Sequence, residues 1–190
     1  VYGKGNATYP QNMYEESVKV PCIISQPGRV PAGVTSDLMA SHYDWLPTLL
    51  EYVGIEQPKN ETLPGNSFAP LIAGGTCDEQ QFIVVYEEYG PVRMIRTRDW
   101  KYIHRYPYGP HELFDLAHDP NEVKNLYDDP AHQTKLHELR AGLEDWFRKY
   151  VNPQVDGVYQ PVTGRGQLRR PGTTAKGELA FYPEIWEYRL

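Results

Sequence analysis

The chain has 190 residues, of which 40% are hydrophobic and 23% charged, and its formal net charge is −6. These values are typical of a globular protein with one large domain, or one domain and part of another. The acidic balance and the lack of a basic stripe with interleaved aromatic residues argue against nucleic-acid binding. No apolar run approaches the roughly 20 residues that a transmembrane helix needs, so no membrane span is expected.

The N-terminal stretch combines a candidate anion-binding residue with a predicted strand. Lys4 stands between Gly3 and Gly5, where a bare backbone allows a ligand to approach closely. A compact ammonium group on a flexible stem suits an oxyanion, although a lysine between two glycines is otherwise an ordinary exposed loop residue. The run Val20–Ser25 is apolar on both faces and predicts a buried strand of a parallel sheet.

The next predicted element is an amphipathic helix. Apolar residues within Leu46–Val53 recur at the spacing i, i+3, i+4, i+7. Asp44 is the predicted N-cap because Pro47 fits only a first turn, and Gly54 ends the helix. One strand and one helix cannot enclose a strand that is apolar on both faces, so exposed apolar surface is expected on residues 1–75.

A loop segment, Glu56–Gln80, separates this region from one with a different periodicity. Its apolar patch Phe68–Ile72 is expected to anchor it to the body of the protein. Four short runs with tight turns between them then predict an antiparallel meander. The runs are Phe82–Tyr89, Val92–Thr97, Trp100–Tyr106 and Glu112–Leu116.

A polar helical turn or two is expected at Asn121–Asp128, followed by a long helix. Asp129 caps this helix, Pro130 occupies its first position, and an apolar stripe continues to Tyr150. The stripe must be buried, and the four-stranded sheet is the expected partner. Three arginines of the meander are expected to pair with two of its glutamates. They are Arg93, Arg96 and Arg98, with Glu87 and Glu88 as partners.

These elements divide the chain into three parts. Residues 1–77 are predicted to form the distal, incomplete part of a catalytic α/β domain. Residues 78–153 are predicted to form a small α+β subdomain of four antiparallel strands packed on a long helix. Residues 154–190 have no sustained period and predict an extended arm held at a few apolar points.

The chain shows none of the motifs of a self-sufficient hydrolase, phosphate-binding loop or zinc site. The six histidines are scattered and predict no metal site. His104 and Arg105 lie in an aromatic and basic loop, and are candidates for substrate recognition because arginine binds carboxylate or sulfate in bidentate fashion. A surface hairpin tip is the alternative. The sequence alone does not decide whether Cys22 and Cys77 form a disulfide.

Several motifs in register resemble the second half of a type I sulfatase. The resemblance runs from residue 1 to about residue 150 and implies an alkaline-phosphatase-like α/β fold. It also implies a C-terminal subdomain in which a helix covers a four-stranded antiparallel sheet, as the periodicity predicts independently. The matching runs are Gly3–Gly5, Tyr14–Gly28, Ser41–Leu50, Arg93–Thr97, Trp100–Tyr102, Glu112–Leu116, Asp119–Glu122 and Asn125–Leu126.

The resemblance also implies a chemistry. Such sulfatases hydrolyse sulfate esters with a formylglycine, made from the Cys or Ser of a C/S-x-P-x-R motif, and a divalent cation, usually calcium. Their catalytic lysine lies shortly before the Tyr-Glu-x-Ser run, which is the position of Lys4. Neither Cys22 nor Cys77 starts the motif. The nucleophile, the metal ligands and a catalytic histidine are therefore expected in a missing N-terminal part, and the chain alone is expected to be inactive.

The partners that the resemblance implies are a sulfated small molecule or saccharide and the missing N-terminal part of the same enzyme. It favours a periplasmic or secreted location. Two alternatives remain open from the sequence. One is a phosphoester or phosphonate hydrolase of the same superfamily, and the other is a non-catalytic module that binds anionic sugars.

Overall fold

The computed structural model describes residues 13–58, 63–87, 92–106, 109–154 and 156. They group into two compact units. The unit that we call the loop unit spans Val20–Ile83, and the sheet unit joins the described residues before Val20 to those from Val84 onward. Lys4 lies outside the described residues, as does nearly all of the predicted arm.

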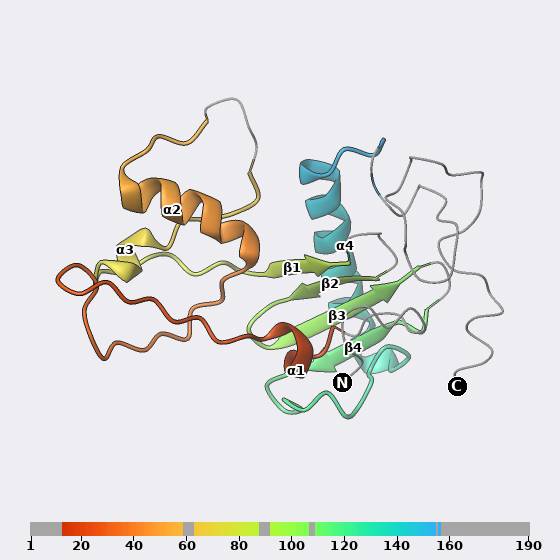
Figure 1. The fold of residues 1–190 in the computed structure, drawn as a ribbon. Helices are drawn as coiled ribbons and strands as arrows, with labels where there is room; N and C mark the ends of the chain where they lie inside the picture. Colours follow the sequence, from red (N-terminus) through yellow and green to blue (C-terminus); the bar gives the residue numbers. More distant parts are fainter. Residues whose placement is uncertain (1–12, 59–62, 88–91, 107–108, 155, 157–190) are drawn as a thin grey trace, which may run out of the picture. The chain divides into compact units, whose positions relative to one another are not determined.

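The sheet unit is built on the predicted meander, and the expectation of a four-stranded antiparallel sheet is confirmed. Its strands follow one another in space in the order β1-β2-β3-β4 (Figure 1). The register places Ile95 of β2 opposite Tyr102 of β3, and Tyr102 opposite Leu113 of β4. The strands are β1 (Ile83–Tyr86), β2 (Val92–Arg96), β3 (Trp100–Arg105) and β4 (Glu112–Asp115).

One face of the sheet is covered by the long helix α4 (Gln133–Tyr150) (Figure 1). A 3-10 turn, η2 (Pro130–His132), leads into it, and the Asp129 carboxylate accepts a hydrogen bond from the Ala131 N–H at 2.9 Å. The predicted partner of the helix is therefore confirmed, whereas Asp129 caps the 3-10 turn and His132 stands at the N-cap position of α4. The apolar stripe is buried at Leu136, Leu139, Leu143, Trp146 and Phe147.

The other face of the sheet is covered by residues just before and within the short helix α1 (Glu15–Val18). Met13 is 3% exposed and belongs to a core cluster with apolar side chains of the strands. The ring of Tyr14 packs edge-on against Phe114, with 6.0 Å between the ring centroids. The sheet therefore has a second buried face, and it is supplied by an N-terminal segment. The cluster comprises Met13, Val92, Met94, Ile103, Phe114 and Leu116.

The turn that follows β4 is not the polar helix expected at Asn121–Asp128. The Asp119 carboxylate accepts hydrogen bonds from the main-chain N–H groups of Val123 and Lys124, at 3.1 and 2.8 Å. Glu122 takes a positive φ of 56°, which a right-handed helix does not allow. A side-chain-capped turn thus replaces the helix because Asp119 offers the backbone a competing acceptor.

The loop unit contains the predicted amphipathic helix, α2 (Trp45–Val53), and its ends are as expected. Asp44 is its N-cap, and Gly54 ends it at a left-handed φ of 76°. The buried Asp44 carboxylate accepts hydrogen bonds from the main chain of Ser41 and Asn66 and from the side chain of Gln80. A single carboxylate therefore holds three separated parts of this unit together. Ser41 precedes the 3-10 turn η1 (His42–Asp44).

The patch Phe68–Ile72 anchors the loop as predicted. It forms the short helix α3 (Ala69–Ile72), and Phe68 is buried with its ring edge-on to Trp45 at 5.2 Å. The Phe68 N–H also donates to the Thr48 hydroxyl at 3.0 Å. The loop is thus attached to α2 by an apolar contact and a polar one.

The predicted buried strand Val20–Ser25 is wrong in this structure. The segment has no regular secondary structure, and Ile23 is 91% exposed. A strand needs a neighbouring strand for its main-chain hydrogen bonds, and no strand lies beside this segment in the part of the loop unit that the structure describes. An apolar run alone does not supply that neighbour.

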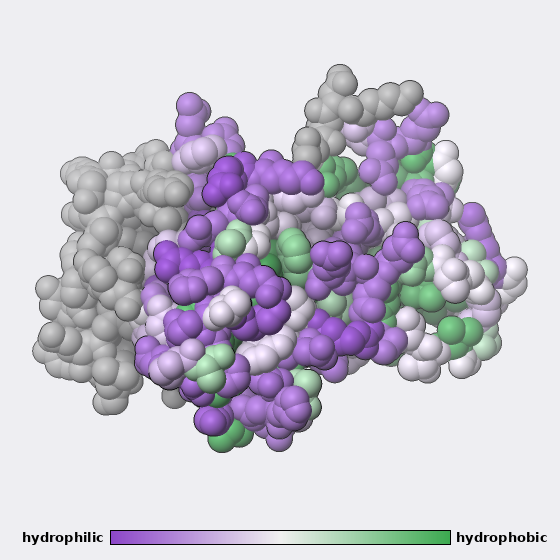
Figure 2. Space-filling model, turned by 180° about the vertical axis from the view of Figure 1, so that it is seen from behind, coloured by the Kyte–Doolittle hydropathy of each residue, from purple (hydrophilic) through white to green (hydrophobic). Residues whose placement is uncertain are grey.

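Exposed apolar surface in the first part of the chain is confirmed for the described residues. Figure 2 shows hydrophobic side chains at the surface among polar ones. One side of α2 contributes Leu46 and Leu49, each 50% exposed, and Val53, 58% exposed. This side carries part of the apolar stripe that predicted the helix. The remaining large exposed apolar residues of the loop unit are Val20, Ile23, Val34 and Ile55.

Candidate functional site

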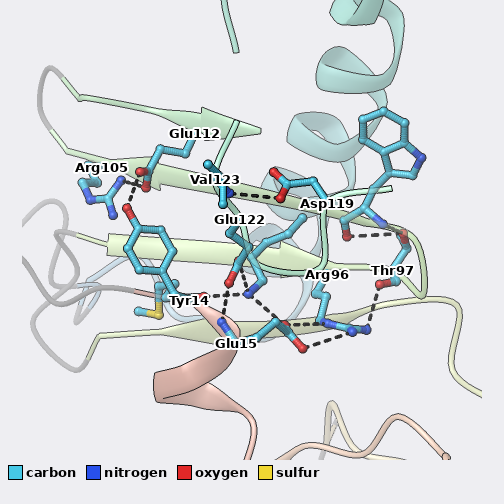
Figure 3. Close-up of polar contacts among 12 residues, drawn as sticks. Tyr14, Glu15, Arg96, Thr97, Arg105, Glu112, Asp119, Glu122 and Val123 are labelled. Carbon is cyan, nitrogen blue, oxygen red and sulfur yellow. Dashed lines mark hydrogen bonds and ion pairs between the residues drawn. The ribbon is translucent and has the colours of Figure 1, made fainter. Parts of the chain in front are cut away.

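A buried cluster of charged side chains lies on the sheet face that α1 covers (Figure 3). We call it the anchor cluster. Its centre is Lys101 of β3, which is fully buried, and its two cations and two carboxylates carry no net charge as ionised groups. Buried charges persist in proteins when they are paired in this way. The members are Glu15, Arg96, Lys101 and Glu122.

Three oxygen atoms lie around the ammonium of Lys101, one main-chain hydrogen-bond acceptor and two carboxylate oxygens in ion pairs. Its Nζ lies 2.9 Å from the main-chain oxygen of Met13. The same atom lies 2.8 Å from Glu15 Oε1 and 2.6 Å from Glu122 Oε1. The lysine therefore joins β3 to two segments that are distant in sequence.

Glu15 is the second centre of the cluster. Its carboxylate accepts two hydrogen bonds from Arg96, from Nε at 2.8 Å and from Nη2 at 3.2 Å. Its main-chain N–H donates to Glu122 Oε2 at 2.6 Å. Burial alone would raise the pKa of Glu15, but Arg96 and Lys101 together outweigh it and lower that pKa. Glu15 thus stays ionised, as the cluster requires.

Tyr14 continues the polar contacts toward β4. Its hydroxyl donates to Glu112 Oε1 at 2.6 Å, and Arg105 forms an ion pair with the other oxygen of Glu112. Burial, followed by the hydrogen bond to Glu112, raises the pKa of Tyr14 to about 12, so the phenol remains a donor. Arg105 also donates to the main-chain oxygen of Pro110 at 3.0 Å. These groups hold α1 and β4 together.

His104 and Arg105, the predicted substrate-binding residues, point to opposite faces of β3 because adjacent side chains of a strand alternate. Arg105 is buried and bound to Glu112. His104 lies half-buried on the α4 side, with its Nδ1 2.6 Å from the Tyr102 hydroxyl and its ring stacked on His111 at 4.3 Å. The structure therefore does not bring the two side chains together. Their role in substrate recognition stays a prediction.

The histidine pair should make the stability of the sheet unit depend on pH. Burial first, and then His111 and two arginines, lower the pKa of His104 to about 3. An unfolded histidine has a pKa of about 6.5, so the unfolded state binds the proton first and stability falls as pH drops from about 6.5 toward 3. In the His104→Gln variant the free energy of unfolding, measured by urea titration across this range, should fall less steeply.

His137→Gln is the matched control for that experiment, because His137 is an exposed histidine of α4. This variant should keep the wild-type slope. Equal slopes for the wild type and the His104→Gln variant would contradict the assigned protonation of His104.

The stretch Ser25–Arg29 has the spacing Ser-x-Pro-x-Arg of a formylglycine motif, but it forms an exposed turn. Arg29 donates to the main-chain oxygen of Tyr52 at 2.8 Å and lies over the Tyr52 ring. Across the described ranges, no group of three or more His, Cys, Asp or Glu residues is placed to hold a metal ion. The described residues therefore provide no calcium site beside Ser25. We assign Ser25–Arg29 as a loop turn.

Two further sequence expectations concern cysteines and ion pairs. Cys22 and Cys77 are free, so no disulfide joins them. Arg96 forms an ion pair with Glu15, and Arg93 forms a buried ion pair with Asp156. The pairing of the meander arginines with Glu87 and Glu88 stays a prediction, because residue 88 lies outside the described residues. None of the helices in the described part of the chain has the length and apolarity needed to cross a membrane.

Comparison with known proteins identifies the family of the chain. Residues 9–149 match the family model described as N-sulphoglucosamine sulphohydrolase, C-terminal. The chain is 31% identical over 155 residues to an N-acetylglucosamine-6-O-sulfatase of Bacteroides thetaiotaomicron, an alignment that covers 76% of the chain and 27% of the relative. It is 35% identical over 147 residues to a Delta 4,5-hexuronate-2-O-sulfatase of the same organism, covering 73% of the chain and 30% of the relative.

A solved structure supports the fold. The yidJ protein of Bacteroides fragilis, assigned as a sulfatase, matches with a TM-score of 0.55 and 25% identity, covering 68% of this chain and 29% of that one. The fold and the sequence matches together define a sulfatase C-terminal region of the alkaline-phosphatase-like superfamily. The chain belongs to the N-sulphoglucosamine sulphohydrolase C-terminal family. It spans about 27–30% of the length of the two sulfatases that it matches above.

Proposed function

We propose that this chain works as the C-terminal portion of a sulfuric ester hydrolase that acts on sulfated saccharides. The family match over residues 9–149 carries the proposal. The two relatives named above are sulfatases of N-acetylglucosamine and of a hexuronate, and both are sugar sulfatases by name. The shared substrate class, a sulfate ester on a sugar ring, is what we extend to this protein.

In this proposal the chain contributes Lys4 to the active site. A lysine at the position that the family uses would stabilise the negative charge that develops on the sulfate in the transition state. The formylglycine and calcium would come from the rest of the enzyme, since the described residues of this chain do not fit them. The chain alone would then not hydrolyse a sulfate ester.

The test measures kcat/KM for a panel of substrates with a longer protein, in which this chain is joined to an upstream sulfatase region. Sulfated glucosamine and uronate sugars are compared with phosphate and phosphonate monoesters carrying the same leaving groups. Hydrolysis of the sulfated sugars with the higher kcat/KM is expected. Preference for phosphonates would favour a phosphonate hydrolase, and binding of sulfated sugars without turnover would favour a sugar-binding module. Either outcome would overturn the proposal.

A further inference from the structure

The anchor cluster binds main-chain atoms of one short segment as well as side chains. Lys101 holds the main-chain oxygen of Met13, and Glu122 holds the main-chain N–H of Glu15. These two contacts come from β3 and from the turn after β4. A cluster that only joined strands of the sheet would need no contact with this main chain.

The segment depends on these contacts for its position. Helix α1 has four residues and no side-chain cap, and a helix of that length is not stable by itself. The side chain of Met13, the hydroxyl of Tyr14 and the anchor cluster attach it to the sheet. Replacing a buried ion cluster with apolar residues is often neutral or favourable for stability, so a role in fixing position accounts for the cluster better than stability alone.

Lys4 lies only nine positions before Met13 in the sequence. A chain spans at most about 3.3–3.6 Å per residue, so Lys4 can lie no further than roughly 30 Å from the Met13 backbone. The point at which the sheet holds Met13 therefore limits where the lysine can be.

We propose that the anchor cluster is a positioning device for the catalytic lysine. Glu15, Arg96, Lys101 and Glu122 fix the main chain at Met13–Glu15, and through it the segment that delivers Lys4 to the sulfate. None of the four contacts the substrate in this scheme. The inference rests on the proposed function, because it assigns a role to the support of Lys4.

The test is a double-mutant cycle in the longer, active sulfatase. Glu122→Gln keeps the size of the side chain and weakens its hold on Lys101 and on the Glu15 N–H. We expect kcat/KM to fall about tenfold, mainly through kcat, because slack in the segment costs transition-state contacts of Lys4. In a Lys4→Ala background the same substitution should change kcat/KM by less than about twofold, since coupled residues are not additive.

A structural readout accompanies the kinetics. Amide hydrogen exchange in residues 13–18 should become faster in the Glu122→Gln variant while β2 and β3 keep their protection. Lys101→Arg is a second variant, which keeps the charge and should retain more activity than Lys101→Met. If Glu122→Gln unfolds the protein, the Lys101→Arg cycle gives the same comparison.

Two control substitutions are compared with Glu122→Gln, one matched in charge and the other in burial. Glu16→Gln removes an exposed carboxylate from the same helix, and Asp156→Asn alters a buried ion pair with Arg93 on the α4 side. Both should leave kcat/KM within about twofold of wild type.

The outcomes separate the inference from the function on which it rests. Equal losses from Glu122→Gln in both backgrounds would show a purely structural cluster and overturn the inference alone. An unchanged kcat/KM in Lys4→Ala would overturn the role of Lys4 and the positioning scheme together.

Discussion

Replacing Lys4 with alanine in the longer sulfatase is expected to lower kcat/KM by about 10²–10³-fold. Removing one group that stabilises developing negative charge in an active site typically costs about 3–4 kcal/mol of transition-state stabilisation. The loss should appear in kcat at least as strongly as in KM, because the charge on the sulfate grows as the ester bond breaks. Steady-state kinetics with a sulfated sugar measure both constants.

The matched control is Lys124→Ala, which removes an exposed lysine from the turn after β4. It changes the net charge by the same amount and should leave kcat/KM within about twofold of wild type. Lys4→Arg should recover part of the activity, since it restores the charge with a different shape. A Lys4→Ala enzyme with wild-type kcat/KM would remove this residue from the mechanism.

Features with a local cause could be predicted from the sequence. The ends of α2 follow from Asp44, Pro47 and Gly54, which act on the backbone within a few residues. The four strands follow from short runs with a period of two residues between tight turns, and α4 follows from an apolar stripe with a period of 3.6 residues. Each of these elements carries its own signal, so the sheet and its helix were expected close to where they lie.

Features that depend on distant partners were not predictable in the same way. The strand expected at Val20–Ser25 required a neighbour that an apolar run does not specify. Arg96 meets Glu15 across 81 positions, a pairing that no spacing indicates. Lys101 had a weak signal, since it alternates with the buried Ile103 on one face of β3, and a lysine there implies a buried acidic partner.

The residues of the candidate site also differ in how far the sequence could predict them. Lys4 was identified from its place in a set of motifs, and its proposed role depends on residues that the described part of the chain does not contain. The anchor cluster came only from the structure, because its members are drawn from α1, β2, β3 and a turn. A charged residue inside an apolar strand is therefore the pattern that points to such a cluster.

Lys101→Met should destabilise the sheet unit by about 3–5 kcal/mol, the usual cost of removing one partner from a buried charge pair. Lys101 is fully buried, and its loss leaves Glu122 without the cation that lies 2.6 Å from it. The free energy of opening can be measured by hydrogen exchange of β2 and β3 amides in urea, which reports on this unit and not on the whole chain. Lys124→Met, at an exposed position, should change it by less than about 0.5 kcal/mol.

The charge balance of the cluster predicts which second substitution rescues this variant. Adding Glu122→Gln to Lys101→Met removes the uncompensated charge and leaves Glu15 paired with Arg96, so more than half of the lost stability should return. Adding Glu16→Gln instead should return none, because that carboxylate is exposed. If both additions had the same effect, the loss would come from the packing of the lysine stem and not from its charge. Rescue by Glu122→Gln alone would establish that the ammonium is retained in this core to hold carboxylates, and the backbone bound to them, in one place.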